Sequence, residues 1–546
     1  MKATLKRSAI RLMSLPPLFR AMNRVLNRAP VIFTLHRRAS PKHGIGGHDP
    51  AVLREQLEFV LGNGYRPVTM DVIDAWVNGE DMDMTNTVAF TFDDGYRDQG
   101  ELIREVFVPL GIPASMFLIT GFVDGKLWPW DARISWLIHH APPAPKDLYL
   151  TATDLRARFE PDRSARRQLV HRLISHVQHR APDTVESVIS ELAKTLGVEL
   201  PGKPPECHAP LSWEDARALE KSGIRFGSHT RSHYIVNTLT PRQLQHEILA
   251  AKERLEAELP APLSSFAYPI GNRWDYSGRE FKVLADAGHT LAVTMSPDIV
   301  ERPEQGGAYG NFAINRFGMP DDLEDFVQYI SWIERLKERA RALSPGNRIR
   351  KRHGSPRCMV EAIKARLNYG LGRLKVAEEI DWSKVRRLVF VCQGNVCRSP
   401  LAETFARQHG LPVISRGLKT NPGTRVNPIA SRIALAMGVD MTEHTSQRFN
   451  PIDLRDGDLV LGMEPVHLAA AGAEIGAKDV QWTLLGIQLP RAKLPYIADP
   501  YGTSDAYHRR CFGLIRAAVD ALAANWLRNS HATQGARRRP SGTSIP

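Results

Sequence analysis

Residues 391–400 constrain the fold of this chain more than any other stretch, because they join an apolar strand to the start of a helix. Residues 388–391 are the kind of short apolar run that forms a buried parallel strand. Ser399 and Pro400, followed by an amphipathic run, predict a helix with Ser399 as its N-cap and Pro400 in its first turn. Residues 392–398 are therefore expected to form a loop between a strand end and a helix N-terminus.

Such a loop suits the binding of a phosphate-like dianion. Its backbone N–H groups and the positive end of the helix dipole favour a bound anion, and they favour the thiolate form of Cys392. Arg398 can donate two hydrogen bonds to phosphoryl oxygens, and Gly394 and Asn395 tolerate the positive φ angles of a tight cradle. A bare Cys-x5-Arg pattern is more often structural, but this one lies at a strand–loop–helix junction.

These residues resemble the low-molecular-weight protein-tyrosine phosphatase family, over roughly residues 385–530. The resemblance implies that Cys392 is the nucleophile, that Ser399 eases departure of its thiolate, and that Asp499 in Asp-Pro-Tyr is the general acid. The implied reaction is attack by Cys392 on a phosphotyrosine, protonation of the leaving phenolate by Asp499, and hydrolysis of the cysteinyl-phosphate, without a cofactor. The expected phosphate-binding loop consists of Cys392, Gln393, Gly394, Asn395, Val396, Cys397 and Arg398.

Two further cysteines bear on this reading. Cys397 corresponds to the family's second loop cysteine, which can form a reversible disulfide with Cys392 under oxidising conditions; a small packed residue is the alternative. Arsenate reduction on the same fold is a weaker alternative, because it needs further redox cysteines in a mobile segment and only Cys511 follows.

Composition limits the class of protein. The chain has 546 residues and 43% hydrophobic content, which predicts two or three domains. Its five cysteines are odd in number and scattered, as expected in a reducing compartment. No window reaches the apolar length of a transmembrane helix, and arginines and prolines interrupt the first thirty residues where a secretory signal would be continuous. These features predict a cytoplasmic protein.

The formal charge of +13 is concentrated in segments 1–38, 335–375 and 528–546, so the rest of the chain is net acidic. This distribution argues against a nucleic-acid-binding surface on either predicted fold. Residues 18–28 place apolar side chains on one side of a helix and arginines on the other. That pattern is typical of peripheral contact with the inner face of an anionic membrane, and equally of a terminal helix packed on its own domain.

From residue 31 onward, strand and helix patterns alternate. The capping-box residues Thr240 and Gln243 predict the start of a helix, which ends before the strand that follows. Polar residues collect just after strand ends, as they do in barrel-like α/β folds, and residues 151–205 are expected to be a charged helical insertion. Apolar runs predict strands at 31–35, 87–92, 113–119, 224–227, 265–268 and 290–295.

Two of these strands are followed by residues that suit a metal site. Asp93 and Asp94 follow one, and His229 and His233 follow another. Imidazoles four residues apart on a helical turn would face the same way, and one carboxylate would complete a three-ligand open site. Adjacent aspartates usually form a solvated turn and such histidine pairs arise by chance, but the position after apolar strands favours the metal site.

Together with Phe-Ala-Tyr-Pro-Ile-Gly at 266–271, these segments resemble the polysaccharide deacetylase (NodB-homology) family, over roughly residues 31–320. The resemblance implies that Asp93 is the catalytic base and that Asp94, His229 and His233 bind a divalent metal, expected to be Zn²⁺. That ion would polarise the carbonyl of an acetamide group.

The sequence departs from the family pattern at two places. The arginine that often precedes the Pro-aromatic motif is Ala267 here, and Arg316 is a candidate replacement. The late catalytic histidine is missing unless His289 serves, which its apolar context disfavours. His36, after the first strand, fits the general acid of relatives that act on poly-N-acetylglucosamine. Trp128 and Trp130 are candidates for stacking on sugars, although tryptophans are more commonly buried.

The sequence therefore predicts an α/β chain in which a distorted (β/α) barrel precedes a doubly wound parallel sheet. The expected function is a bifunctional hydrolase in exopolysaccharide metabolism or its regulation, acting on an N-acetylated sugar and on a phosphotyrosine protein such as a bacterial tyrosine kinase. The alternative is a phosphatase whose deacetylase-like module only binds sugar or docks. The predicted parts are a basic arm (1–30), the barrel (31–335), a basic linker (336–384), the phosphatase (385–530) and a disordered tail (531–546).

Overall fold

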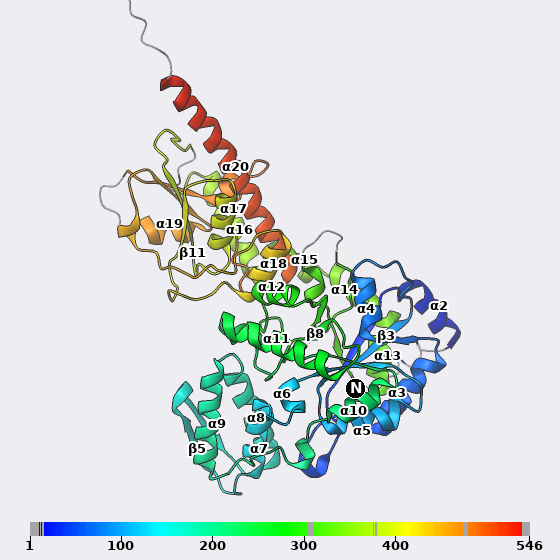
Figure 1. Cartoon of the computed structure of the whole chain (residues 1–546). Helices are drawn as coiled ribbons and strands as arrows, with labels where there is room; N and C mark the ends of the chain where they lie inside the picture. Colours follow the sequence, from blue (N-terminus) through cyan, green and yellow to red (C-terminus); the bar gives the residue numbers. More distant parts are fainter. Residues whose placement is uncertain are drawn as a thin grey trace, which may run out of the picture. The chain divides into compact units, whose positions relative to one another are not determined.

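A computed structural model describes residues 10, 13, 16–303, 309–374, 376, 379–472 and 479–537 (Figure 1). The chain forms two compact units. One contains residues 1–276 and 280–339, and the other contains residues 277–279 and 340–546.

The first unit is built on an eight-stranded parallel sheet. A parallel bridge joins Val293 to Ile314, and the strand that follows pairs with β1, so the sheet curls into a half-barrel. Because the strands are parallel, their carboxyl ends lie along one rim. The strands run in the order β10 (Phe317–Gly318), β1 (Val31–Leu35), β3 (Thr87–Asp94), β4 (Ala114–Leu118), β7 (Ile224–Ser228), β8 (Ser265–Ala267) and β9 (Leu291–Val293), with β2 (Arg66–Val68) beside β3.

Every strand predicted for this unit is confirmed. β3 continues to Asp94, so Asp93 and Asp94 end a strand and do not form a turn. The short strands β2 and β10 escaped prediction, because two or three residues carry no readable apolar pattern. Both hydrogen bonds of the predicted capping box are present at the start of α11 (Pro241–Glu258), between Thr240 and Gln243.

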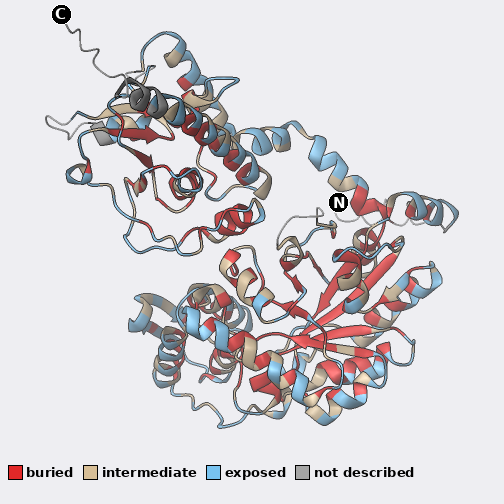
Figure 2. Cartoon of the chain, turned by 45° about the horizontal axis from the view of Figure 1, so that its top comes forward, coloured by how far each residue is buried: buried red, intermediate tan, exposed pale blue. Residues whose placement is uncertain are grey.

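Helices cover the sheet, and Figure 2 shows buried strands inside exposed helical faces. All residues of β1 and β4 are buried, which explains why these strands are continuous apolar runs and do not alternate. The other helices of this layer are α2 (Pro16–Leu26), α3 (Pro50–Gly62), α4 (Met70–Val77), α5 (Arg97–Leu102), α6 (Thr120–Val123), α10 (Trp213–Glu220), α12 (Gly278–Asp286), α13 (Leu323–Ile330) and α14 (Trp332–Leu343).

The amphipathic segment at residues 18–28 is largely helix α2, and it packs on its own unit. Phe19 is fully buried, with its ring centroid 5.7 Å from that of Phe59. Leu18 and Val25 are exposed beside the arginines. The packing of Phe19 supports the interpretation as a packed terminal helix, while contact of the exposed side with a membrane stays a prediction.

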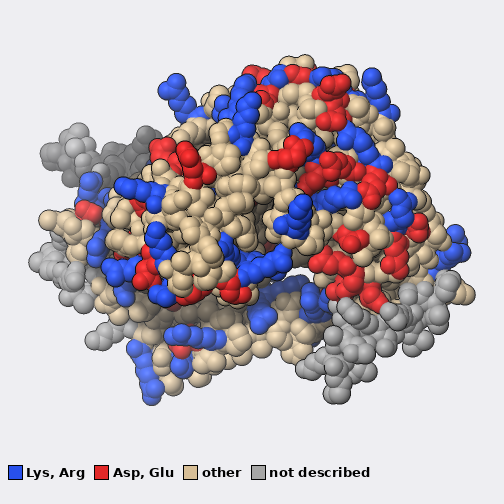
Figure 3. Space-filling model, turned by 90° about the horizontal axis from the view of Figure 1, so that it is seen from below, with Lys and Arg blue, Asp and Glu red and all other residues tan. Residues whose placement is uncertain are grey.

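No helix in the described ranges combines the length and apolar character needed to cross a membrane. On the face drawn in Figure 3, Lys and Arg side chains stand among Asp and Glu side chains and do not form one continuous basic surface.

An insertion between β4 and β7 has a small apolar core of its own, formed by side chains such as Leu137, Leu148, Leu173 and Leu192. The helices predicted for residues 151–205 are present, but the prediction missed an antiparallel hairpin, whose second strand lies within that range. The outer faces of this hairpin are exposed and charged, so its sequence does not read as strand. The insertion consists of α7 (Trp130–His140), β5 (Lys146–Leu150), β6 (Leu155–Phe159), α8 (Arg163–Val177) and α9 (Pro182–Leu196).

The second unit contains a four-stranded parallel sheet in the order β12 (Val413–Gly417), β11 (Arg387–Cys392), β13 (Asp458–Gly462) and β14 (Gln481–Leu484). In this doubly wound sheet, ligands bind beyond the carboxyl ends of the strands at the point where the strand order reverses, which is at the end of β11. The surrounding helices are α17 (Arg398–Gln408), α18 (Pro428–Ala436), α19 (Pro465–Gly472) and α20 (Asp505–Arg537).

The predicted linker and part of the predicted disordered tail are helical. Within the predicted linker lie α15 (Pro345–His353) and α16 (Pro356–Gly370), each capped by a serine that precedes a proline. A serine followed by a proline is a signal for a helix start, but the basic composition of these residues favoured a linker. In the predicted disordered tail, α20 continues to Arg537, and residues 538–546 lie outside the described residues.

Candidate active sites

Asp94, His229 and His233 come together at the carboxyl rim of the first sheet. One ligand atom from each lies within 4.8 Å of the others. Nε2 of His233 is 3.3 Å from Oδ1 of Asp94, and Nε2 of His229 is 3.5 Å from the same oxygen. The three predicted metal ligands therefore form a cluster that could hold one ion.

The two histidines are not on a helical turn, so that part of the prediction was wrong. β7 ends at Ser228, and the next residues form an irregular loop. Thr230 and His233 have φ angles of 65° and 64°, and Asp94 has a φ angle of 87°. Such angles cost non-glycine residues about 1–3 kcal/mol each and persist where the surrounding structure imposes them. The loop's left-handed residues, and not helical periodicity, aim both imidazoles at Asp94.

Each imidazole is also held by its other nitrogen. Nδ1 of His229 is 2.7 Å from the carbonyl oxygen of Ala267, which makes Nδ1 the donor and leaves Nε2 to face Asp94. Nδ1 of His233 is 3.3 Å from Oδ1 of Asp131. Fixing the outer nitrogen in this way is typical of histidines that bind metals.

The donor set fits a divalent cation. Two imidazole nitrogens and one carboxylate leave a fourth position open, as in catalytic zinc sites. Burial alone would lower the pKa of His233, but the hydrogen bond with Asp131 and the charge of Asp94 raise it to about 9. The same carboxylates attract positive charge to the cluster, which a metal ion would supply in place of the proton.

Asp93 is buried beside this cluster and is paired with Arg316. Arg316 donates from Nη1 to Oδ1 of Asp93 at 2.8 Å and from Nη2 to Oδ2 at 2.6 Å. Burial alone would raise the pKa of Asp93, but Arg316 and then His229 hold it below its usual value. The structure thus brings Arg316 to the carboxylate, as expected of a replacement for the arginine missing at Ala267.

The two candidate acids lie at opposite ends of the sheet. His36 follows β1 at the carboxyl rim and is exposed. His289 is buried, with Nδ1 3.0 Å from the carbonyl oxygen of Ser264, at the amino end of β8. Its position excludes it from this cluster.

Residues of the insertion support the histidine loop. The indole Nε1 of Trp130 donates to the carbonyl oxygen of His233 at 3.0 Å. Glu186 accepts hydrogen bonds from Arg133 and from the hydroxyl of Tyr234. Trp128 and Trp130 are both buried, as in the alternative interpretation of these tryptophans, and neither offers a face to a sugar.

In the second unit, Cys392 ends β11 and lies under the loop that precedes α17. Its Sγ accepts a hydrogen bond from the backbone N–H of Asn395 at 3.2 Å and is 3.0 Å from Oγ of Ser399. α17 begins at Arg398, and Cys397 occupies the N-cap position without a side-chain cap bond. Ser399 is therefore not the predicted N-cap, because its hydroxyl faces Cys392.

Asn395 holds this loop in shape. Its φ angle is 52°, as predicted, whereas Gly394 lies outside the positive-φ region and that prediction was wrong. The Asn395 side chain donates to Oγ of Ser399 at 2.9 Å and to Oγ of Ser415 at 2.8 Å. At Gly417, an added Cβ would lie 2.9 Å from Cβ of Asn395, so only glycine fits beside the loop.

Arg398 connects the loop to the distant Asp-Pro-Tyr segment. It is buried, and it donates from Nη1 to Glu464 and to the carbonyl oxygen of Ile497, the latter at 2.8 Å. Its Nη2 is 3.0 Å from Oδ2 of Asp499. Burial opposes the charge of Arg398, but Asp499 and Glu464 raise its pKa. The structure thus brings together Cys392, Arg398, Ser399 and Asp499 as expected.

Comparisons with known proteins agree with this geometry. The family model described as low molecular weight phosphotyrosine protein phosphatase matches residues 387–532, and the polysaccharide deacetylase model matches residues 82–292. The probable phosphatase EpsP of Ralstonia nicotianae is 30% identical over 139 residues, which are 25% of this chain and 93% of that protein. The chain belongs to the low molecular weight phosphotyrosine protein phosphatase family. Its first unit carries a polysaccharide deacetylase domain.

Other similar proteins match one domain each. The phosphatase Wzb of Salmonella typhi is 30% identical over 151 residues, covering 27% of this chain and 97% of Wzb. Among solved structures, the Streptococcus pyogenes deacetylase PplD covers 56% of this chain and 98% of its own, with 14% identity and a TM-score of 0.36. The Erwinia amylovora tyrosine phosphatase AmsI covers 28% of this chain and 97% of its own, with 27% identity and a TM-score of 0.25.

Several residues of both domains escaped prediction. Asp131 belongs to the insertion, and no spacing in the sequence links it to the deacetylase histidines. Glu464 follows the end of β13 in the phosphatase domain, a position that could have identified it as a site residue.

Burial raises the pKa of Cys397 well above its usual value and that of Cys511 to about 12, so both are held as thiols. A buried thiol within α20 is not the mobile redox cysteine that arsenate reduction requires.

Proposed function

We propose that the chain is a bifunctional hydrolase with one independent site in each unit. The phosphatase site acts on phosphotyrosine. Cys392 attacks the phosphorus atom, Arg398 binds two phosphoryl oxygens, and Asp499 protonates the leaving phenolate. A water molecule then attacks the phosphorus of the cysteinyl-phosphate and releases phosphate, and the hydroxyl of Ser399 donates to the Cys392 sulfur as the thiolate leaves.

One observation carries the phosphatase proposal. The buried Nε–H of Arg398 has no hydrogen-bond partner among the described residues, while its Nη atoms reach Glu464 and Asp499. A buried guanidinium donor without a partner is costly unless an anion completes it. The loop of residues 392–398 is the place where that anion would lie, directly above Cys392.

The deacetylase site would act on an N-acetylated sugar. Asp94, His229 and His233 would hold a divalent ion, with Zn²⁺ proposed, and such an ion polarises the carbonyl of an acetamide group. Asp93, kept ionised by Arg316, takes the proton of the attacking water. His36 donates a proton to the departing amine from the same rim.

The pairing of Asp93 with Arg316 favours a catalytic deacetylase domain over a module that only binds or docks. A binding module gains nothing from a buried carboxylate that is held ionised beside a metal cluster, whereas a general base needs that arrangement. We assign the protein to exopolysaccharide metabolism or its regulation, and its phosphatase substrate to a phosphotyrosine protein such as a bacterial tyrosine kinase.

The test is a metal assay on purified full-length protein, together with deacetylation of N-acetylglucosamine oligomers. The proposal expects about one divalent ion per chain and release of amine that stops when a chelator removes the ion. Full deacetylation by metal-free protein would overturn the metal mechanism. Stoichiometric metal without deacetylation of any acetylated sugar would favour the binding module.

A further inference from the structure

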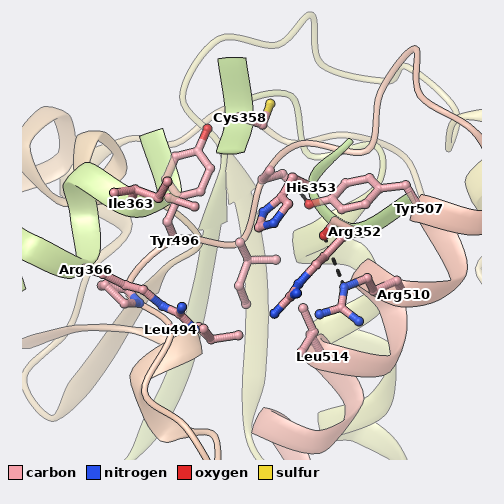
Figure 4. Close-up of a pocket in the computed structure, with 14 residues that line it drawn as sticks. Arg352, His353, Cys358, Ile363, Arg366, Leu494, Tyr496, Tyr507, Arg510 and Leu514 are labelled. Atoms are coloured by element: carbon pink, nitrogen blue, oxygen red, sulfur yellow. Dashed lines mark hydrogen bonds between the residues drawn. The ribbon is translucent and has the colours of Figure 1, made fainter. Parts of the chain in front are cut away.

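A pocket in the second unit lies outside the phosphate loop. Its walls come from α15, α16, the segment at residues 494–498 and α20 (Figure 4). Helices α15 and α16 precede residue 387, where the match to the phosphatase family begins. Two walls of the pocket therefore come from helices that the family match does not include, and the other two lie within the matched residues.

The pocket is basic. Arg352, Arg366 and Arg510 line it together with His353, and no acidic residue is among its lining residues. Within the described ranges, none of these arginines has a carboxylate at ion-pair distance, and Arg510 instead donates from Nε to the carbonyl oxygen of Arg352 at 3.1 Å. Figure 4 shows the Arg352 and Arg510 side chains next to each other and Arg366 on the opposite wall.

The positive field of these arginines converges inside the pocket. Burial lowers the pKa of His353, and the charges of Arg352, Arg510 and Arg366 lower it further. The three arginines are exposed and have no carboxylate partner among the described residues, so their combined charge attracts an anion to the pocket. Planar guanidinium groups match the oxygens of a phosphoryl group, which accepts paired hydrogen bonds from them.

We propose that this pocket is a second anion site of the phosphatase unit, which binds the phosphoryl group of a phosphate-bearing ligand through Arg352, Arg366 and Arg510. The ring of Tyr496 and the side chains of Leu494 and Leu514 line the rest of the pocket and suit the organic part of that ligand. Two sources carry this chemistry: a free phosphate compound, and a second phosphorylated residue of the phosphoprotein substrate. The second source rests on the proposed phosphatase function.

The pocket shares a wall with the segment that carries the general acid. The hydroxyl of Tyr507, in the pocket, donates to the carbonyl oxygen of Ala498 at 3.3 Å. On the other side, Arg398 donates to the carbonyl oxygen of Ile497 at 2.8 Å. A ligand that shifts this wall moves Asp499 through the adjoining peptide units, so occupancy changes the rate of leaving-group protonation.

The binding test uses pyrophosphate as the probe, with calorimetry on chelator-treated full-length protein. Wild type is expected to bind one more pyrophosphate than Arg352→Gln/Arg510→Gln. The matched control is Arg357→Gln/Arg509→Gln, which removes the same charge from α16 and α20 outside the pocket lining. The control should bind as wild type does. Equal stoichiometry in all three proteins, or equal loss in both variants, overturns the proposal.

The kinetic arm distinguishes the two sources. If the ligand is free, pyrophosphate changes kcat for phenyl phosphate, whose leaving group needs the proton, at least about twofold in wild type and the control, and this change is absent in Arg352→Gln/Arg510→Gln. If the ligand is part of the substrate, a peptide with two phosphotyrosines has a lower KM than its singly phosphorylated form, and only the pocket variant loses the difference. If wild type shows neither effect, the proposed coupling to Asp499 is overturned. Absence of all phosphatase activity refutes the proposed function, while the stoichiometry still decides the pocket.

Discussion

Arg316 and Asp93 form a fully buried, two-pronged ion pair although they are 223 residues apart in the chain. Both carboxylate oxygens are used, and Arg316 also donates to Oγ1 of Thr91 at 2.9 Å. The deacetylase domain therefore fixes a negative charge beside the Asp94, His229 and His233 cluster by means of a residue from outside the family motif. This pair keeps the proposed base ionised without a metal contact.

The pair predicts strong coupling in stability. Arg316→Met leaves Asp93 charged and unpaired in the interior, which should destabilise the domain by about 3–5 kcal/mol. The double variant Asp93→Asn/Arg316→Met removes both charges and should cost less than Arg316→Met alone. Chemical denaturation measures both, with exposed Arg242→Met as the control near zero. Additive losses in the double variant would show that the pair is not coupled.

The contact between Asp131 and His233 predicts an effect on metal affinity. Asp131→Asn should weaken metal binding about 10- to 100-fold, because a carboxylate on the outer nitrogen orients a ligand and increases its basicity. Competition with a chromophoric chelator measures the affinity. Asp183→Asn, on an exposed position of the same insertion, is the control. Asp94→Ala should lose the metal altogether, whereas Asp93→Asn should retain it. Unchanged affinity in Asp131→Asn would reduce that contact to a structural one.

The phosphatase site predicts a dependence on the leaving group. Cys392→Ser should abolish hydrolysis of aryl phosphates, because the nucleophile is lost. Asp499→Asn should slow hydrolysis most for phenols of high pKa, which need a proton to leave, and least for p-nitrophenol. The slope of log kcat/KM against leaving-group pKa measures this. An equal loss across all leaving groups would show that Asp499 acts by binding phosphate and not as the acid.

His289 predicts acid sensitivity of the first unit. Burial lowers its pKa to about 4 in the folded state, against about 6.5 unfolded. The unfolded chain binds the extra proton as pH falls from 6.5 to 4, so stability is lost in that window, by up to about 3 kcal/mol from this group. His289→Gln should flatten the pH dependence of denaturation and keep deacetylase activity. Exposed His246→Gln is the control, and loss of deacetylation in His289→Gln would return the acid role to His289.

The sequence could predict the strands and most of the site residues because both sites lie at the ends of apolar strands. Cys392 ends β11 and Asp94 ends β3, and such positions are readable from apolar runs and from the polar residues after them. The order of the two families' motifs along the chain then identified His229 and Asp499. The predicted residues of each site do meet in space.

The rest could not be read locally because it depends on contacts between distant segments. The left-handed backbone at Thr230 and His233 follows from tertiary packing, and a four-residue spacing wrongly suggested a helical turn. Asp131 reaches His233 only because the insertion folds beside the sheet. Ser399 was misread as a cap because local propensity favours that role, whereas its hydroxyl faces Cys392.

The proposed function gives one chain two independent hydrolytic sites. The decisive measurement assays wild type, Asp94→Ala and Cys392→Ser of the same full-length protein for both deacetylation of N-acetylglucosamine oligomers and hydrolysis of aryl phosphate. We expect that wild type has both activities, that Asp94→Ala loses only deacetylation, and that Cys392→Ser loses only phosphate hydrolysis. Loss of both activities in either variant, or deacetylation that persists in Asp94→Ala, would contradict it.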